Sequence, residues 1–481
     1  MSIARHTIYN FAGSAAPLLV SIATVPLYIG LIGLDRYGLL AIFWLLIGYF
    51  TIFDFGIGKA AMQRISALNR SSPSKRSRIF WTALGLTASL SMLAMLFFVP
   101  IGWIGLRWFS GSGSSLTAEV RQVFPLLVVA VPIPMFQGLL VGALNGRLKF
   151  RETNLISSAG AVLTAVLPLA AARYVGAELL PIFSAVILSR LLVLAALAIT
   201  CRRQLLLEAP QFTSPSEIRR MIRFGGWLTI SNLIGPFLVF ADRFVIGALL
   251  GATAVGIYTI PFNLVTQLWI LPGAIASALF PRLASASGDE ADRLLGLALS
   301  SLLSILLPVT AVLLVCAKPG LVLWLGNSTG LASAPIGIIL LLGFWINSLA
   351  QMPFARLQSA GRTDVIAKIH LVELIPFLTI LYFLTQSLGL IGAAIAWNLR
   401  VLVDFAALAW TGRIARNLLY RTAAGLVMLT TIAGALMVDT TLTKTVAMIL
   451  TMLTIPMAIL LAPSDLRSIL IERSKSALRL T

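Results

Sequence analysis

The stretch that decides the fold is Asp242–Tyr258, DRFVIGALLGATAVGIY, which sets a charged pair inside a long apolar run. An earlier stretch, Tyr28–Gly38 with the sequence YIGLIGLDRYG, repeats its spacing of glycines. A shift of 217 residues places Ile29–Gly30 on Ile246–Gly247, and a shift of 218 places Gly33, Gly38 and Arg64 on Gly251, Gly256 and Arg282. This internal repeat of two long apolar segments predicts a membrane protein built of two lobes.

The composition places the chain in a membrane. Of its 481 residues 59% are hydrophobic and only 11% are charged, and the mean hydropathy is +0.97. A soluble domain has about 45–50% apolar and about 25% charged residues, so no soluble core of this length could hide so much apolar surface. The apolar runs last about 20 residues or more, whereas the strands of a β-barrel alternate over about 10 residues. The sequence therefore predicts an all-α polytopic membrane protein.

About 14 apolar runs are long enough to cross a bilayer as helices. The expected spans are 7–33, 38–63, 79–106, 120–145, 154–173, 179–200, 222–250, 255–281, 293–317, 333–357, 366–386, 389–411, 422–438 and 444–462. The first run is too long for the apolar region of a cleavable signal peptide, so we interpret it as the first membrane helix.

The net charge of +19 first suggests nucleic acid, but the basic residues lie between the apolar runs rather than in one patch. Cytoplasmic loops are rich in Lys and Arg, so the basic connections identify the cytoplasmic side. These connections are 70–78, 147–151, 202–223, 362 and 413–416, together with the tail 467–479. Both termini are then cytoplasmic, and no nucleic-acid partner is expected. Two cysteines and two histidines lie too far apart to predict a metal site.

The first twelve spans are expected to form two lobes of six helices each. The N-lobe covers residues 1–203, a cytoplasmic linker covers 204–220, and the C-lobe covers 221–417. Two extra C-terminal helices occupy 418–462, and the tail 463–481 spaces leucines helically among basic residues, as an amphipathic surface helix does. Each lobe begins on the cytoplasmic side, so the repeat is a parallel one, related by an axis along the membrane normal.

Basic residues inside the expected spans are the first candidates for a substrate site. A charged side chain at a helix centre costs about 2.5–3.5 kcal/mol on insertion scales, so it should face protein or water. Arg190 and Arg400 lie near the middle of two spans, at matching positions of the repeat. Arginine binds phosphate oxygens with a planar fork, so an excess of intramembrane arginine predicts a phosphate or diphosphate substrate. The full set of candidates is Arg190, Arg400, Lys59, Arg243, Arg64 and Arg356.

Acidic residues inside the spans are candidates for coupling to a proton or cation, and no other cofactor is expected. They are Asp54, Glu373, Asp404 and Asp242. Asp404 follows Arg400 by one helical turn, and at this i,i+4 spacing the two side chains can form an ion pair. A purely structural ion pair is the alternative interpretation of Asp242–Arg243, and snorkelling to the interface is the alternative for Arg64 and Arg356.

Three stretches resemble the Wzx-type polysaccharide and O-antigen flippases of the multidrug/oligosaccharidyl-lipid/polysaccharide (MOP) exporter superfamily. They are PLYIGLIGLDRYGLLA at 26–41 followed by FDFGIG at 53–58, ADRFVIGALLGATAVGIY at 241–258, and LQSAGRTD at 357–364. The resemblance implies two lobes around a central cationic cavity, lined by Arg190 and Arg400 and, less directly, by Asp54, Lys59 and Arg243. It implies alternating access, with undecaprenyl-diphosphate-linked oligosaccharide units moving from the inner to the outer leaflet of the bacterial cytoplasmic membrane. Coupling to an H⁺ or Na⁺ gradient or to the membrane potential is implied, and the sequence does not choose between these. Membrane lipids and polysaccharide polymerase machinery are the further partners expected.

Other functions remain as alternatives. A multidrug antiporter of the same superfamily would favour acids in its cavity, and sequence separates a lipid II flippase poorly from the other flippases. A membrane-embedded polymerase or ligase generally needs a large catalytic loop, whereas the external connections here are short. No GxxxxGK[ST] nucleotide-binding pattern occurs. We therefore expect a secondary transporter rather than an enzyme, in which Arg190 and Arg400 face one aqueous cavity and bind the diphosphate or an acidic sugar.

Overall fold

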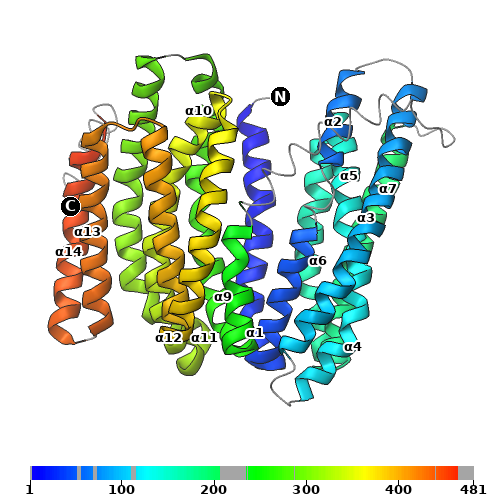
Figure 1. The fold of residues 1–481 in the computed structure, drawn as a ribbon, viewed down its shortest axis with the longest axis horizontal. Helices are drawn as coiled ribbons and strands as arrows, with labels where there is room; N and C mark the ends of the chain where they lie inside the picture. The colour runs from blue at the N-terminus through cyan, green and yellow to red at the C-terminus, as the bar shows by residue number, and fades with distance from the viewer. Residues whose placement is uncertain are drawn as a thin grey trace. The chain divides into compact units, whose positions relative to one another are not determined.

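A computed structural model describes residues 3–50, 56–68, 73–109, 115–205, 235, 237–286, 288–438 and 440–463 of the chain. Within these ranges the regular structure is entirely helical (Figure 1). Ten helices of the described part are long and apolar enough to cross a membrane. Helices are the expected outcome because hydrocarbon offers no water to the backbone, so each N–H must find its partner within its own segment. The all-α, multi-pass membrane fold is confirmed.

The chain folds as two compact units. The first comprises Met1–Phe240 with Leu250–Gly256, and the second comprises Ala241–Leu249 with Ile257–Thr481. The domain boundaries expected from the sequence stay predictions, because most of the linker 204–220 and of the tail 463–481 lies outside the described residues.

Seven helices lie entirely within the described part of the first unit. They are α1 (Ile3–Phe50), α2 (Ile57–Ala67), α3 (Pro73–Phe109), α4 (Ser115–Ala130), α5 (Pro132–Gly146), α6 (Phe150–Tyr174) and α7 (Leu179–Leu205). Helix α6 packs between α1 and α7, and α5 packs against α2, α3 and α7. The run 120–145 lies in one candidate span, Leu116–Gly146, as expected. This span is interrupted only locally between α4 and α5, where Pro132 lacks a backbone N–H and is suited to the first turn of α5.

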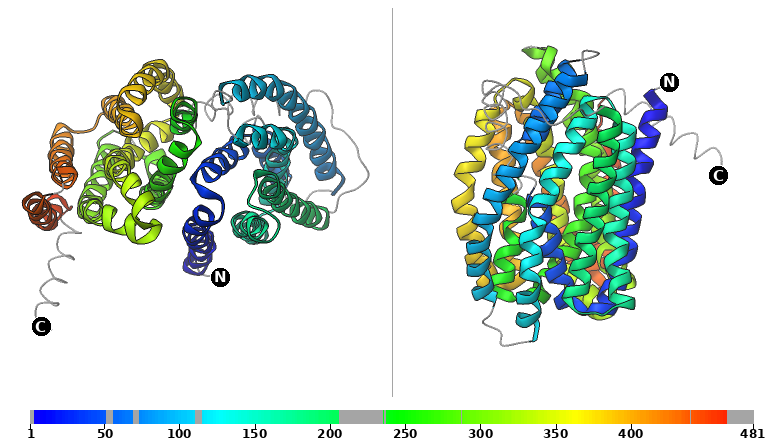
Figure 2. Two further views of the ribbon diagram at one scale, coloured as in Figure 1. Left: turned by 90° about the horizontal axis from the view of Figure 1, so that it is seen from below. Right: turned by 90° about the vertical axis from the view of Figure 1, so that its right-hand side faces the viewer.

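The remaining helices begin with one over 237–250, which crosses the boundary between the units. It is followed by α9 (Ala252–Thr266), a short 3-10 turn η2 (Gln267–Trp269), α10 (Ile270–Ser285), α11 (Asp289–Ser359), α12 (Thr363–Thr411), α13 (Arg416–Val438) and α14 (Thr441–Leu461). In the second unit α11 contacts α10, α12, α13 and α14. Helices α13 and α14 lie next to each other at one side of this unit (Figures 1 and 2).

Three helices are too long for one crossing and are broken by a glycine. Helix α11 has 71 residues, which at about 1.5 Å each would reach over three times the hydrocarbon thickness of about 30 Å. Gly33 in α1, Gly326 in α11 and Gly389 in α12 have φ of +77°, +79° and +62°, a backbone conformation that favours glycine. Each break falls at or between two of the expected spans. The count of fourteen stays a prediction, because residues 206–234 and parts of other connections are not described.

Glycines bring helices of the first unit into close contact. Gly138, Gly142 and Gly146 recur every four residues on α5 and face α2. A Cβ atom at Gly58 of α2 would lie 2.6 Å from the carbonyl oxygen of Gly138, and one at Gly142 would overlap the carbonyl of Gly58. Small residues at this spacing let membrane helices approach until their backbones touch.

The two copies of the repeated motif also meet inside the first unit. The hydroxyl of Thr253 donates a hydrogen bond to the carboxylate of Asp35, its equivalent in the repeat 218 residues earlier. A Cβ at Gly256 would lie 3.0 Å from the carbonyl oxygen of Leu34 and 3.5 Å from the backbone nitrogen of Gly38. Of the repeated glycines, Gly38 and Gly256 are thus required by close packing, whereas Gly33 and Gly251 have no atom near an added Cβ and instead share a positive φ.

Candidate functional site

The buried charged residues described in the second unit gather in two places. The first is the pair Asp242–Arg243, whose side chains are 0% and 2% exposed. The Asp242 carboxylate accepts hydrogen bonds from the backbone N–H of Arg243 (2.8 Å), from the Arg243 guanidinium (2.9 Å) and from the hydroxyl of Tyr258 (2.7 Å). The guanidinium also lies 3.8 Å from the ring centre of Phe262. This arrangement favours the structural interpretation of the pair over a role in lining a cavity.

Aromatic packing holds this pair in place. Phe262 of α9 lies edge-on to Phe344 of α11 and to Trp397 of α12, with ring centres 5.1 and 5.5 Å apart. Phe344 and Trp397 stack at 4.5 Å. The repeat motif therefore begins in a rigid core of the second unit.

The second gathering lies on α12, on both sides of the break at Gly389. Nε2 of His370 is 3.5 Å from a carboxylate oxygen of Asp404, so the two halves of the helix meet here. Glu373 is 7% exposed, and it interacts electrostatically with Asp404 and Arg400. With both carboxyl groups ionised, neither oxygen of Glu373 has a hydrogen-bond partner among the described residues, and its contact with Asp404 becomes a hydrogen bond only when one of the two carries a proton. Two buried carboxyl groups beside each other are a place where a proton or a monovalent cation would be stabilised.

Arg400 belongs to the same group of residues. Its side chain is 8% exposed, its Nε has no hydrogen-bond partner among the described residues, and its guanidinium carbon lies 5.9 Å from the ring centre of Phe377. The expected ion pair between Arg400 and Asp404 is wrong for the described structure. Asp404 instead approaches His370 from the other half of α12, because the break at Gly389 brings that half alongside.

Arg190 is the corresponding residue of the first unit, on α7. It is half-buried, and its Nε also lacks a partner within the described ranges. The side-chain amide of Gln137 on α5 donates a 2.8 Å hydrogen bond to the Arg190 carbonyl and so fixes this part of α7. Both matched arginines thus keep hydrogen-bonding capacity that an anion could use.

The other candidates lie elsewhere. Arg356, in the last turn of α11, forms a 3.7 Å ion pair with the exposed Asp292. On α2, Lys59 is exposed and Arg64 is half-buried in the last turn. These positions agree with residues that reach toward an interface. Asp54 lies outside the described residues.

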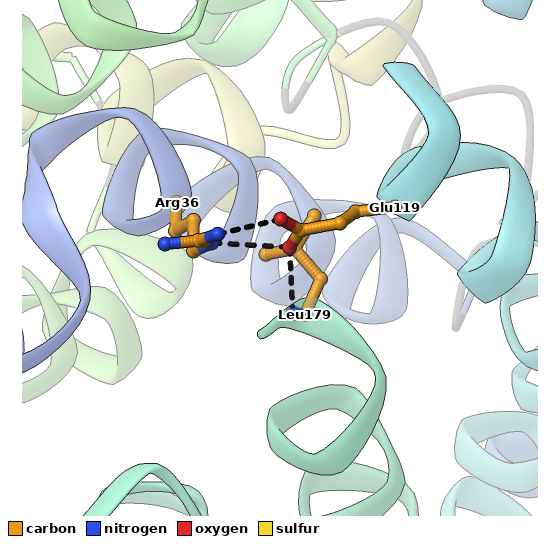
Figure 3. Close-up of polar contacts among 3 residues, drawn as sticks. All are labelled: Arg36, Glu119 and Leu179. Atoms are coloured by element: carbon orange, nitrogen blue, oxygen red, sulfur yellow. Dashed lines mark hydrogen bonds and ion pairs between the residues drawn. The ribbon is translucent and has the colours of Figure 1, made fainter. Parts of the chain in front are cut away.

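Sequence reasoning missed a polar contact in the first unit. Figure 3 shows the guanidinium of Arg36 bound to both carboxylate oxygens of Glu119, at 2.6 and 3.0 Å. The same carboxylate accepts a 3.0 Å hydrogen bond from the backbone N–H of Leu179, at the first residue of α7. Glu119 thereby ties α4 to α1 just after its break and to the start of α7. The signal was present in the sequence, since Arg36 is a basic residue in a connection expected to lie outside, where such residues are rare.

Comparisons with known proteins identify the family. Residues 3–287, more than half of the chain, match the model of a family described as polysaccharide biosynthesis protein. The chain belongs to this family. A Shigella flexneri protein named "Putative O-antigen transporter" is 30% identical over 413 residues, which are 85% of this chain and 97% of that protein. The resemblance found in the sequence motifs is confirmed.

Solved structures share the fold of this chain. The lipid II flippase MurJ in an inward closed conformation superposes with a TM-score of 0.71 at 13% identity, over 94% of this chain and 98% of MurJ. An inward-facing multidrug resistance MATE transporter of the MOP superfamily superposes with a TM-score of 0.65 at 16% identity, over 86% and 98% of the two chains. The expected class, a membrane transporter rather than an enzyme, is confirmed by these relatives taken together.

Proposed function

We propose that this protein is a flippase that moves undecaprenyl-diphosphate-linked oligosaccharide repeat units from the inner to the outer leaflet of the bacterial cytoplasmic membrane. Both termini would be cytoplasmic. The observation that carries the proposal is the similarity to the Shigella flexneri protein over 97% of that protein's length. The MOP-superfamily fold is consistent with alternating access.

Chemically, the substrate proposal rests on two arginines inside the expected spans. A diphosphate carries several charged oxygens and cannot enter hydrocarbon without replacement of its hydration. Arg190 and Arg400 each offer a guanidinium with unused donors, and charge-assisted hydrogen bonds to such groups contribute about 1.5–3 kcal/mol each. Each arginine acts within its own unit in this proposal, and the polyprenyl chain stays among membrane lipids.

Coupling is the second part of the proposal. Glu373 and Asp404, next to Arg400, would bind H⁺ or Na⁺. Binding of the cation would change the charge beside Arg400, so anion affinity and ion occupancy would depend on each other. Polysaccharide polymerase machinery that takes up the flipped units remains a predicted partner.

The proposal is tested in cells that depend on this protein for surface glycan. Arg190→Ala and Arg400→Ala are expected to reduce glycan export about 10- to 100-fold, the loss of one charge-assisted contact. Lipid-linked repeat units should then accumulate on the cytoplasmic side. Arg416→Ala, at an exposed arginine at the start of α13, is the matched control and should export normally. Expression and membrane insertion are measured for every variant.

The same experiment separates the alternatives. Repeat units that reach the outer face but stay unpolymerised would favour a polymerase or ligase. Loss of peptidoglycan precursors from the outer face, with normal surface glycan, would favour a lipid II flippase. Altered drug resistance alone would favour a multidrug antiporter.

A further inference from the structure

A pocket of about 390 Å³ opens in the second unit where four elements meet. These are the first turns of α11, the turn between α12 and α13, the start of α13 and the end of α14. The basic connection 413–416 places this end of the helices on the side expected to be cytoplasmic. None of His370, Glu373, Arg400 and Asp404, the charged or titratable group described on α12, lines the pocket.

Three arginines line the pocket, one from each of three elements. They are Arg293 of α11, Arg413 of the α12–α13 turn and Arg421 of α13, and all three are exposed. None of the three guanidinium groups has an ion-pair or hydrogen-bond partner among the described residues. Asp292 is the one acid in the lining, and its carboxylate lies 3.7 Å from Arg356. Asp289 and Glu290, the other acids at this end of α11, do not line the pocket. The pocket therefore carries a net positive charge.

The rest of the lining is mainly apolar. It includes Leu295, Leu297, Leu418 and Leu461, with Pro463 just after the end of α14. A free inorganic anion would make no favourable contact with these leucines. A molecule with an anionic head and acyl chains would contact both the arginines and the leucines. Basic pockets between membrane helices at the cytoplasmic interface have this combination when they hold lipid head groups.

Arg413 occupies a backbone position that usually belongs to glycine. Its φ is +56°, and it closes α12 with hydrogen bonds from Arg413 N–H to Trp410 O (3.2 Å) and from Ile414 N–H to Ala409 O (3.0 Å). A left-handed conformation is unfavourable for a non-glycine residue, because its Cβ crowds the following carbonyl oxygen. Substitution by glycine would therefore remove the guanidinium and relieve the backbone at the same time. Binding and stability can be separated at this residue.

We propose that this pocket binds the head group of an anionic phospholipid from the cytoplasmic leaflet, with the three arginines on its phosphate and the leucines against its acyl chains. The site is distinct from the proposed transport site and does not depend on the flippase function. It would hold α13 and α14 against α11 from the membrane side.

The test uses the full chain, purified in detergent, stripped of lipid and titrated with dioleoyl phosphatidylglycerol or dioleoyl phosphatidylcholine. Bound lipid is counted by native mass spectrometry. The wild type is expected to bind phosphatidylglycerol at least tenfold more tightly than phosphatidylcholine. Arg413→Gly should weaken phosphatidylglycerol binding about fivefold, and the triple change of Arg293, Arg413 and Arg421 to Gln about 100-fold, at about 1 kcal/mol for each arginine.

Two further readouts make the result decisive. Arg416→Gln, a neighbouring exposed arginine outside the pocket, should bind phosphatidylglycerol as the wild type does. Arg413→Gly should unfold at the same or a higher temperature without lipid, so lost binding would not reflect lost folding. Equal binding of the two lipids, equal binding by all variants, or full displacement of phosphatidylglycerol by equimolar inorganic phosphate would each overturn the proposal.

Discussion

At the scale of residues, Glu373 and Arg400 are the side chains whose burial most needs an explanation. Both lie on α12 with less than a tenth of their surface exposed, and both keep polar atoms without a partner among the described residues. An unsatisfied buried polar group costs about 1–3 kcal/mol in mutational data, and more when it is charged. A chain that retains both gains something other than stability from them, which is consistent with binding of an ion and an anion in turn.

Glu373→Gln tests the ion-binding part. The amide has nearly the same shape but no charge, so the thermal unfolding temperature should stay the same or rise. Glycan export driven by an imposed ion gradient should fall at least tenfold, measured in membrane vesicles. Glu290→Gln, at an exposed acid of α11, serves as the control. Full gradient-driven export by Glu373→Gln would remove Glu373 from the coupling site.

Substitution of Asp242 or Arg243 should lower the stability of the protein, rather than transport by a stable protein. Removing one partner of a buried, hydrogen-bonded pair typically costs about 3–5 kcal/mol, because the other charge stays buried. We expect Asp242→Asn to lower the unfolding temperature strongly, and the double change Asp242→Leu with Arg243→Met to restore much of the loss. Folded protein that still exports glycan in the double variant is the predicted result. A double variant that folds normally but exports nothing would show that the pair acts in transport.

These residues also show what the sequence could and could not predict. The matched positions and depth of Arg190 and Arg400 follow from counting along apolar runs. The side chains that contact these charged residues could not be predicted in the same way, because such contacts depend on how each helix is rotated and on where helices break. Tyr258 and Phe262 surround Arg243 from α9, and His370 takes the place beside Asp404 that i,i+4 spacing gave to Arg400.

At the scale of elements, glycines determine how helices bend and how closely they pack. The expected span boundaries lie close to the breaks at Gly33, Gly326 and Gly389, since each interrupts a run longer than the bilayer. The fourth expected span is a single span, Leu116–Gly146, and only its local break before Pro132 was missed, because the apolar run is continuous in the sequence. The close contact of α5 with α2 was also missed, since it needs both helices in place.

Gly142→Leu tests the packing of α5 on α2. Its side chain would meet the backbone of Gly58, and overpacking of this kind costs about 1–3 kcal/mol or more. We expect a lower unfolding temperature and less protein in the membrane. Gly434→Leu on α13 is the matched control, because no atom lies within 4 Å of its added Cβ. Equal loss in both variants would mean that glycine content, rather than this contact, determines stability.

At the scale of the whole molecule, the internal repeat and the distribution of charge were the features from which the fold class could be predicted. Apolar runs of about 20 residues and basic connections define the class of protein with no further information. The shift of 218 residues that relates the two motifs is the same separation that joins Asp35 to Thr253 in the structure. The transported molecule leaves no comparable pattern, because a binding site assembled from many helices is not encoded in any one stretch.

The most direct test of the central claim is transfer of a fluorescent undecaprenyl-diphosphate oligosaccharide across proteoliposomes that contain only this protein. Labelled lipid that reaches the outer leaflet is quenched by a membrane-impermeant reductant. The account predicts transfer well above that of protein-free liposomes, about 10- to 100-fold slower transfer in Arg190→Ala and in Arg400→Ala, and normal transfer in Arg416→Ala. Transfer no faster than in protein-free liposomes, or transfer unchanged by both arginine substitutions together, would contradict it.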